Sequence, residues 1–279
     1  MEELSKHWEQ FFHDEREDSF WKRKKQLWKK RNGDIIRIRG QGQIYERNVY
    51  ENHKQLQYLL HLTFLIKQKG HFHIEEQVLP FKLLIWDGNI IRHEAVEQTR
   101  QEEKQQLKWP DPFHRIEHRF SYDRRAAVQY AERWWNSYNP QYRRFDDDCT
   151  NYISQCLRAG GAPMWGSPSR ETGWWYTGNN WSFSWAVAHS FRWYLSGSEQ
   201  GMKGTEVSSP DQLTYGDVIC YDFEGDGRWD HTTIVTAKDA YGMPLVNAHT
   251  NNSRHRYWSY EDSMAWTENT KYKFFRIGD

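Results

Sequence analysis

Apolar side chains recur at helical spacing near the start of the chain, between stretches of charged residues. A repeat of three or four positions places such side chains on one face of a helix. The positions are Leu4, Trp8, Phe11, Phe20, Trp21, Leu27 and Trp28. The pattern predicts one amphipathic helix over roughly residues 2 to 31, which Asn32-Gly33 would end.

Strict alternation of apolar and polar side chains follows, which is the period of a β-strand. From Leu56 to Ile66 every second residue is apolar, and shorter runs at 36–39, 72–74 and 81–86 have strand character. Asp87-Gly88 has the composition of a hairpin turn leading to Ile90 and Ile91. A helix followed by an antiparallel meander predicts a small α+β domain within residues 1–110, including the first part of a highly charged linker over residues 92–118.

A second domain is predicted over residues 120–279. Its first helix carries Ala127, Tyr130, Ala131 and Trp134 on one face, with Asp123 as the N-cap and Asn139-Pro140 as the stop. A short apolar helix over Cys149–Leu157 comes next and stops at Gly160-Gly161. Four strands are predicted at 217–222, 231–237, 244–249 and 272–277.

Composition limits the partners. The 38 basic and 38 acidic residues cancel, so no overall field draws the chain to nucleic acid or to an anionic membrane. No apolar run spans a bilayer and the N-terminus lacks a signal peptide pattern, so a cytoplasmic location is expected. Three cysteines without a CxxC pair indicate free thiols, and 16 Trp, 16 Tyr and 14 Phe predict an aromatic core.

Candidate chemistry begins with Cys149 at a helix N-terminus, where the positive end of the helix dipole favours a thiolate. Its backbone N–H would contribute to an oxyanion hole. His231 opens a β-branched strand and is the expected base. His249 and Asn251 lie two residues apart on one face and either would orient the base; His249 is favoured because it lies in the extended segment.

The segment from residue 222 to residue 230 places acidic side chains at positions 1, 3, 5 and 9 of a loop, with glycine at position 6, as a calcium loop does. The candidate ligands are Asp222, Glu224, Asp226 and Asp230. Position 12 is Thr233 instead of the bidentate glutamate, so a polar hairpin turn without metal is the competing interpretation.

Six tryptophans stand between residues 165 and 193, and such rings either line a groove that stacks sugar or peptide or pack in the core. Core packing accounts for most of them. Trp174 and Trp175 are adjacent, so at least one is expected to be exposed and to support substrate binding.

Three runs of sequence together resemble one family: Asp148 to Met164, Gly216 to Ile219 with Trp229-Asp230-His231, and Ala248 to Asn251. They are similar to the putative amidase domain family of Gram-positive bacteria, a relative of the NlpC/P60 and CHAP cell-wall peptidases. The resemblance covers residues 120–279 and implies a papain-like fold, with a cysteine-bearing helix packed on an antiparallel sheet. It implies Cys149 as nucleophile, His231 as base, His249 as orienter and Asp148 as a site for a substrate amine.

The expected function is therefore that of a cysteine amidase or peptidase. It would hydrolyse amide bonds of peptidoglycan stem peptides through a thioester and need no cofactor. The family analogy adds cell-wall association to the expected locations, and the N-terminal domain would target or regulate the enzyme. Two alternatives stay open: a non-catalytic module that binds cell-wall or protein ligands on the same scaffold, and an acyltransferase that uses the same Cys-His pair.

Overall fold

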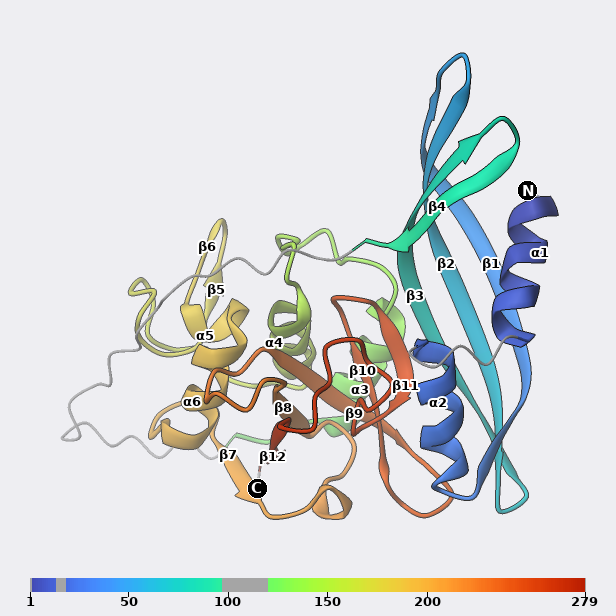
Figure 1. Ribbon diagram of the computed structural model, residues 1–279. Coiled ribbons are helices and arrows are strands. Elements are labelled where there is room, and N and C mark those ends of the chain that lie inside the picture. Colours follow the sequence, from blue (N-terminus) through green and yellow to red (C-terminus); the bar gives the residue numbers. More distant parts are fainter. Residues whose placement is uncertain (1, 14–18, 97–119, 279) are drawn as a thin grey trace.

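A computed structural model describes residues 2–13, 19–96 and 120–278. It combines helices with antiparallel sheet, which confirms the predicted α+β class (Figure 1). The strands of the main sheet are β1 (Gly33–Val49), β2 (His53–Gln68), β3 (His71–Trp86), β4 (Asn89–Ala95), β7 (Gly204–Val207), β8 (Val218–Asp222), β9 (His231–Lys238), β10 (Pro244–Ala248), β11 (Ser253–Tyr257) and β12 (Lys271–Ile277). Their order is β1-β2-β3-β11-β10-β9-β8-β12-β7, with β4 also paired to β3.

Two N-terminal helices, α1 (Glu2–His13) and α2 (Phe20–Lys29), replace the single predicted helix over residues 2–31. Ser19 breaks the run because its backbone is extended and its hydroxyl accepts a hydrogen bond from the Lys22 N–H at 3.2 Å, which caps α2. The predicted stop at Asn32-Gly33 is confirmed within three residues, and Asn32 has a left-handed φ of 52°.

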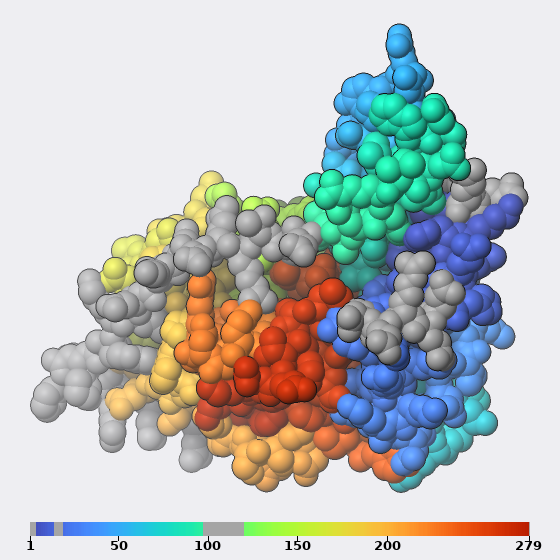
Figure 2. Space-filling model, in the orientation of Figure 1, coloured from blue at the N-terminus to red at the C-terminus, as the bar shows by residue number. Residues whose placement is uncertain are grey.

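The first strands follow the predicted alternation. In β2 every second side chain from Leu56 to Ile66 is buried, under α1 and α2. The runs at 72–74 and 81–86 belong to one strand, β3, which continues through Pro80. The predicted hairpin at Asp87-Gly88 joins β3 to β4. Figure 2 shows the far ends of the β1–β2 and β3–β4 hairpins projecting beyond the body of the molecule.

One sheet runs through both halves of the chain. β3 pairs with β11, where Gln77 lies opposite Ser253 and Glu76 opposite Arg254 (Figure 1). Leu245 and Tyr257 belong to the same apolar cluster as the buried residues of α2 and β2. The division into domains at 1–110 and 120–279 stays a prediction, and the two parts share a sheet and an apolar cluster.

The second half contains α3 (Arg124–Trp134), α4 (Cys149–Ala159), α5 (Phe183–Ala186) and α6 (Ala188–Gly197). It also has a short 3-10 turn η1 (Pro210–Gln212) and a small hairpin of β5 (Tyr176–Thr177) and β6 (Asn180–Trp181). The Asp123 cap is confirmed, since its carboxylate accepts from the Ala126 N–H at 2.9 Å. The four predicted strands correspond to β8, β9, β10 and β12.

Two strands of the main sheet, β7 and β11, were not predicted from the pattern of apolar residues. β11 reads Ser-Arg-His-Arg-Tyr and therefore has no alternation of apolar side chains. It lies between two other strands, and its polar side chains bond to neighbouring elements instead of entering an apolar core; Arg254, for example, pairs with Glu76 of β3 at 2.8 Å and Glu132 of α3 at 2.6 Å.

The predicted aromatic core is confirmed, and tryptophans are its largest members. The expectation that one of Trp174 and Trp175 is exposed is wrong, because they are 0% and 1% exposed. Their indole N–H groups donate to the Ser154 hydroxyl at 2.9 Å and the Ser169 carbonyl at 3.0 Å. Both rings therefore pack in the interior and present no face to solvent. Among the described residues no helix combines the length and apolar character that crossing a bilayer requires.

Candidate functional site

Cys149 is the first residue of α4 and follows the N-cap residue Asp148. Its side chain is buried, with 4% of the residue exposed. The sulfur lies 3.6 Å from the Thr150 hydroxyl, which in turn lies 3.1 Å from the Thr232 hydroxyl. Thr232 also hydrogen-bonds to the thiol itself. The start of α4 is thus joined to the start of β9.

The pKa of the Cys149 thiol is raised from its ordinary value. Burial is the main cause, because a thiolate loses its hydration there, and hydrogen bonds from Thr150 and Thr232 act in the opposite direction. The raised pKa of this thiol is opposite to the lowered pKa expected for a cysteine at a helix N-terminus. A nucleophilic role for this thiol requires a base that removes its proton.

His231 is the first residue of β9 and lies opposite Tyr221 of β8. Its imidazole contacts the rings of Tyr221, Phe223 and Tyr260, with centroids 5.6, 6.1 and 5.2 Å away. Its Nε2 lies 3.3 Å from the Tyr260 hydroxyl.

Side chains alternate along β9, so His231 shares a face of the sheet with Tyr221, while Thr232 faces α4. Cys149 directly precedes Thr150, and His231 directly precedes Thr232, so both residues adjoin the hydroxyl pair that joins α4 to β9.

His249 contacts groups other than His231. Its Nδ1 lies 2.7 Å from Asp148 Oδ2 and its Nε2 lies 2.7 Å from the Trp134 carbonyl oxygen, while its ring stacks on Tyr152 at 3.9 Å. A carbonyl only accepts, so Nε2 carries a proton there. Both ring nitrogens are thereby engaged in tying the cap of α4 to the end of α3. The predicted role of His249 as the orienter of His231 receives no support from these contacts.

Asp148 and Asn251 differ in their surroundings. Besides His249, the Asp148 carboxylate accepts hydrogen bonds from the Phe145 N–H at 3.0 Å and the Asn151 amide at 2.9 Å. Recognition of a substrate amine by Asp148 stays a prediction, and an amine would have to replace one of these donors. Asn251 is exposed in the turn after β10, with a left-handed φ of 61°.

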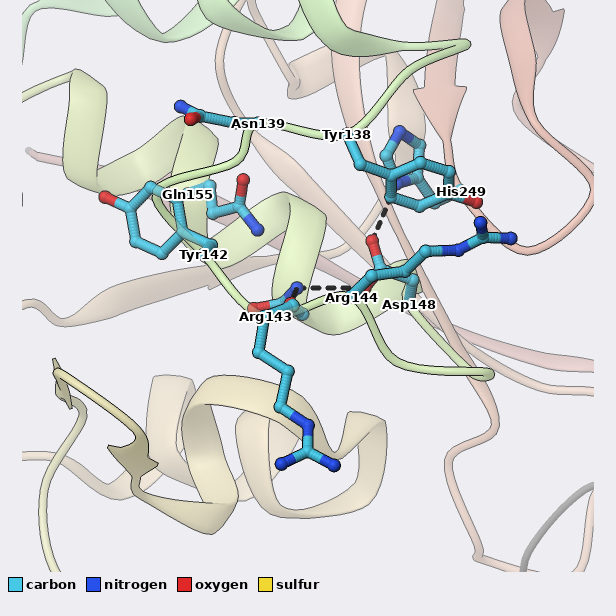
Figure 3. Close-up of a pocket in the computed structure, with 9 residues that line it drawn as sticks. Tyr138, Asn139, Tyr142, Arg143, Arg144, Asp148, Gln155 and His249 are labelled. Atoms are coloured by element: carbon cyan, nitrogen blue, oxygen red, sulfur yellow. Dashed lines mark hydrogen bonds and ion pairs between the residues drawn. The ribbon is translucent and has the colours of Figure 1, made fainter.

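A small hollow opens beside the start of α4, with about 10 Å³ of space for the centre of a water-sized sphere (Figure 3). Figure 3 shows Asp148 and His249 directed toward each other in its wall. The lining residues are Tyr138, Asn139, Tyr142, Arg143, Arg144, Asp148, Asn151, Gln155 and His249. This space is about that of one water molecule, so the hollow holds one small functional group of a substrate at most.

The predicted calcium loop brings three of its four acidic residues together. Oxygens of Asp222, Glu224 and Asp230 lie within 4.8 Å of one another. Asp226 instead accepts a hydrogen bond from the Arg228 N–H at 2.8 Å. Asp222 already accepts from the Gly225 and Gly227 N–H groups at 2.7 and 2.8 Å, as the metal-free polar turn requires. The oxygen donors suit calcium, and its binding stays a prediction.

These features define an α+β protein with a buried cysteine at the N-terminus of a helix that packs on an antiparallel sheet. The chain belongs to the family described as "Putative amidase domain", whose model matches residues 121–275 and supports an amidase-like function at the family level. This confirms the family resemblance found in the sequence.

Two relatives come from Bacillus subtilis (strain 168). The chain is 47% identical over 270 residues to "Uncharacterized protein YhbB", covering 92% of this chain and 85% of that protein. It is 34% identical over 122 residues to "Uncharacterized protein YjcM", covering 40% of this chain and 27% of that protein. No solved structure matches the chain.

Sequence reasoning missed Tyr260 and the threonine pair. Tyr260 lies in a polar segment 29 positions after His231, and no periodicity marks it. Thr150 and Thr232 did carry a signal, because each follows directly a residue singled out for chemistry.

Proposed function

We propose that this protein is a cysteine-dependent amidase in which Cys149 is the nucleophile and His231 the base. The observation that carries the proposal is the 3.1 Å hydrogen bond between the hydroxyls of Thr150 and Thr232. This bond holds the first turn of α4 against the first residues of β9. Cys149 and His231 each directly precede one of the two threonines that form it. The family to which the chain belongs supports an amide as the substrate.

In this scheme His231 must accept a proton before attack, because burial keeps the thiol protonated. In the proposed reaction the proton of the thiol passes to Nδ1 of His231. The sulfur then bonds to the amide carbonyl carbon, and the backbone N–H of Cys149 stabilises the oxyanion. Collapse breaks the C–N bond, and the amine leaves with the proton from His231. Water, deprotonated by His231, hydrolyses the thioester to a free acid and restores the thiol.

The substrate would be a peptide amide, and peptidoglycan stem peptides are the first class to test because the family that the sequence resembles is a relative of the NlpC/P60 and CHAP cell-wall peptidases. The hollow beside Asp148 and His249 would receive one polar group of such a peptide. No step of the scheme uses a cofactor.

The test is the rate at which iodoacetamide alkylates each cysteine at pH 7, mapped by mass spectrometry, in the wild type, His231→Ala and His249→Ala. Cys156 and Cys220 are fully buried and serve as internal controls. Fast alkylation of Cys149 that slows at least tenfold in His231→Ala supports the pair. Loss of stem-peptide hydrolysis in Cys149→Ser completes the test. Alkylation of Cys149 at the slow rate of the other two thiols, in all three proteins, would refute it.

Burial of both reactive residues, with 4% and 6% exposed, favours a second candidate, a non-catalytic binding module. In that case Cys149 is a small core residue at the end of α4. Binding of stem peptides that is unchanged in Cys149→Ser, together with no release of free acid by the wild type, would establish this function instead.

A further inference from the structure

We propose that Tyr260 is the positioning residue of His231. Its hydroxyl holds the imidazole in the tautomer that carries its proton on Nε2 and its lone pair on Nδ1, the atom that accepts the thiol proton in the proposed reaction. The inference rests on the proposed function, because it assigns a partner to the base of that reaction. It gives Tyr260 the role that the sequence suggested for His249 or Asn251.

The hydroxyl of Tyr260 has two neighbours in the site. His231 Nε2 lies 3.3 Å away, and the Ser253 hydroxyl lies 3.3 Å away on β11. A phenol both donates and accepts one hydrogen bond easily. When Tyr260 donates its proton to Ser253, its oxygen accepts from Nε2–H of His231. The lone pair of the neutral imidazole then resides on Nδ1, as the proposed reaction requires.

The phenol keeps its proton for this purpose. Burial raises the pKa of Tyr260, while the nearby Arg256 acts in the opposite direction. A neutral hydroxyl serves the imidazole before and after it takes up the thiol proton, since Nε2–H donates in both states. The separation of 3.3 Å is long for such a bond, and bonds of this kind tighten in the substrate complex.

The backbone of Tyr260 is held in an unusual conformation. Its φ of 58° lies in the left-handed region, which an aromatic residue rarely adopts. Such a conformation persists where the surroundings determine it, and it concentrates at functional sites. Here the ring is packed between two other rings: its centroid lies 5.0 Å from that of Tyr221 and 5.2 Å from that of His231.

Arg256 stabilises that placement from β11. Its guanidinium carbon lies 4.0 Å from the centre of the Tyr260 ring, and its Nε donates to Asp262 at 3.0 Å. Asp262 in turn pairs with Lys24 of α2 at 2.7 Å, and Lys24 pairs with Glu75 of β3. Two cations and two carboxylates therefore form a buried, charge-balanced cluster behind Tyr260, and two of its members come from the N-terminal part of the chain.

The experiment compares Tyr260→Phe with a matched control, Tyr221→Phe. Each variant removes one buried hydroxyl from a ring that contacts His231, but the Tyr221 hydroxyl bonds to Thr233 and the Trp258 carbonyl instead. Losing one hydrogen bond to the base is expected to slow alkylation of Cys149 about three- to tenfold in Tyr260→Phe. Tyr221→Phe is expected to leave the rate within about twofold of wild type.

A second readout is made on the wild-type protein and does not depend on Tyr260→Phe. Long-range ¹H–¹⁵N spectra of the wild-type protein report which ring nitrogen of His231 carries the proton, assigned by loss of the signal in His231→Ala. A protonated Nε2 with an unprotonated Nδ1 is the expected result. The opposite tautomer overturns the inference whatever the stability of the variants.

The outcomes separate the two proposals. If His231→Ala slows alkylation and Tyr260→Phe behaves as Tyr221→Phe does, the role of Tyr260 is refuted and the Cys-His pair stands. If His231→Ala itself has no effect on Cys149, the proposed function fails first.

Discussion

Replacing Lys24 with methionine is expected to destabilise the protein far more than any surface charge change. Lys24 and Glu75 have fully buried side chains, and Asp262 is 1% exposed, so both carboxylates depend on cations inside the protein. Lys24→Met leaves two carboxylates with Arg256 as their remaining partner in the cluster. Removing one partner of a buried pair costs about 3 to 5 kcal/mol, because the other charge remains buried without compensation.

Lys30→Met, at the C-cap of the same helix, is the matched control. Lys30 pairs with Glu261 at 3.5 Å, with its side chain 68% exposed, and such exposed pairs contribute about 0 to 1 kcal/mol. Urea unfolding followed by tryptophan fluorescence measures both variants, with the slope m checked for two-state behaviour. The double variant Lys24→Met/Glu75→Gln removes one charge of each sign and is expected to recover a large part of the loss.

The unfolding free energy lost in Lys24→Met should also depend on pH. Burial raises the pKa of Glu75, and Lys24 acts against that rise, so its removal raises the pKa further. A carboxyl group with a raised pKa destabilises the folded state above its unfolded pKa, and this effect shrinks as the pH falls toward that value. The difference between Lys24→Met and wild type should therefore be smaller at pH 5 than at pH 8. A difference below about 1 kcal/mol at pH 8 would contradict the buried cluster.

Three further predictions address other contacts. Thr232→Val removes the hydroxyl bond to the first turn of α4 and should cost about 1 kcal/mol of unfolding free energy while slowing alkylation of Cys149; an unchanged alkylation rate would show that this bond does not order the junction. Burial raises the pKa of Glu132, but the hydrogen bond from His255 and the charge of Arg254 outweigh it and lower the pKa to about 2. The ionised Glu132 carboxylate therefore stabilises the folded state by at most about 3 kcal/mol above pH 4.5, and this stabilisation is lost as the pH falls toward 2. Unfolding of Glu132→Gln between pH 2 and 7 should therefore converge with wild type at the acid end, and parallel curves would contradict the assignment. If the loop at Asp222 binds calcium, millimolar Ca²⁺ should raise the midpoint of thermal unfolding of the wild type but not of Asp222→Asn, and no rise in either leaves the loop as a polar turn.

Much of the fold could be predicted because local rules and burial agree. The alternation in β2, the Asp123 cap and the short helix from Cys149 each express a pattern that one stretch of sequence contains. The break at Ser19 was harder to find, because the apolar spacing continues on both sides of it. β11 was missed since its place in the sheet depends on polar contacts with distant residues.

In the candidate site too, local sequence patterns could be predicted and contacts between distant residues could not. The order of motifs indicated Cys149 and His231, but the partners of each side chain depend on elements that lie far apart in the sequence. His249 bonds to Asp148 and to the end of α3, and Tyr260 reaches His231 from a loop held by residues of α2 and β3. The raised pKa of Cys149 likewise reflects burial, which a helix N-terminus in the sequence does not reveal.

The pairing of β3 with β11 has a consequence for how this chain can be divided. A fragment that begins near residue 120 would keep every residue matched by the family model, yet β11 would become an edge strand with unpaired backbone groups where β3 now lies. Exposed edges recruit strands from other molecules, so such a fragment is expected to self-associate in solution. A related domain that lacked this N-terminal segment would need another structure to protect the same edge.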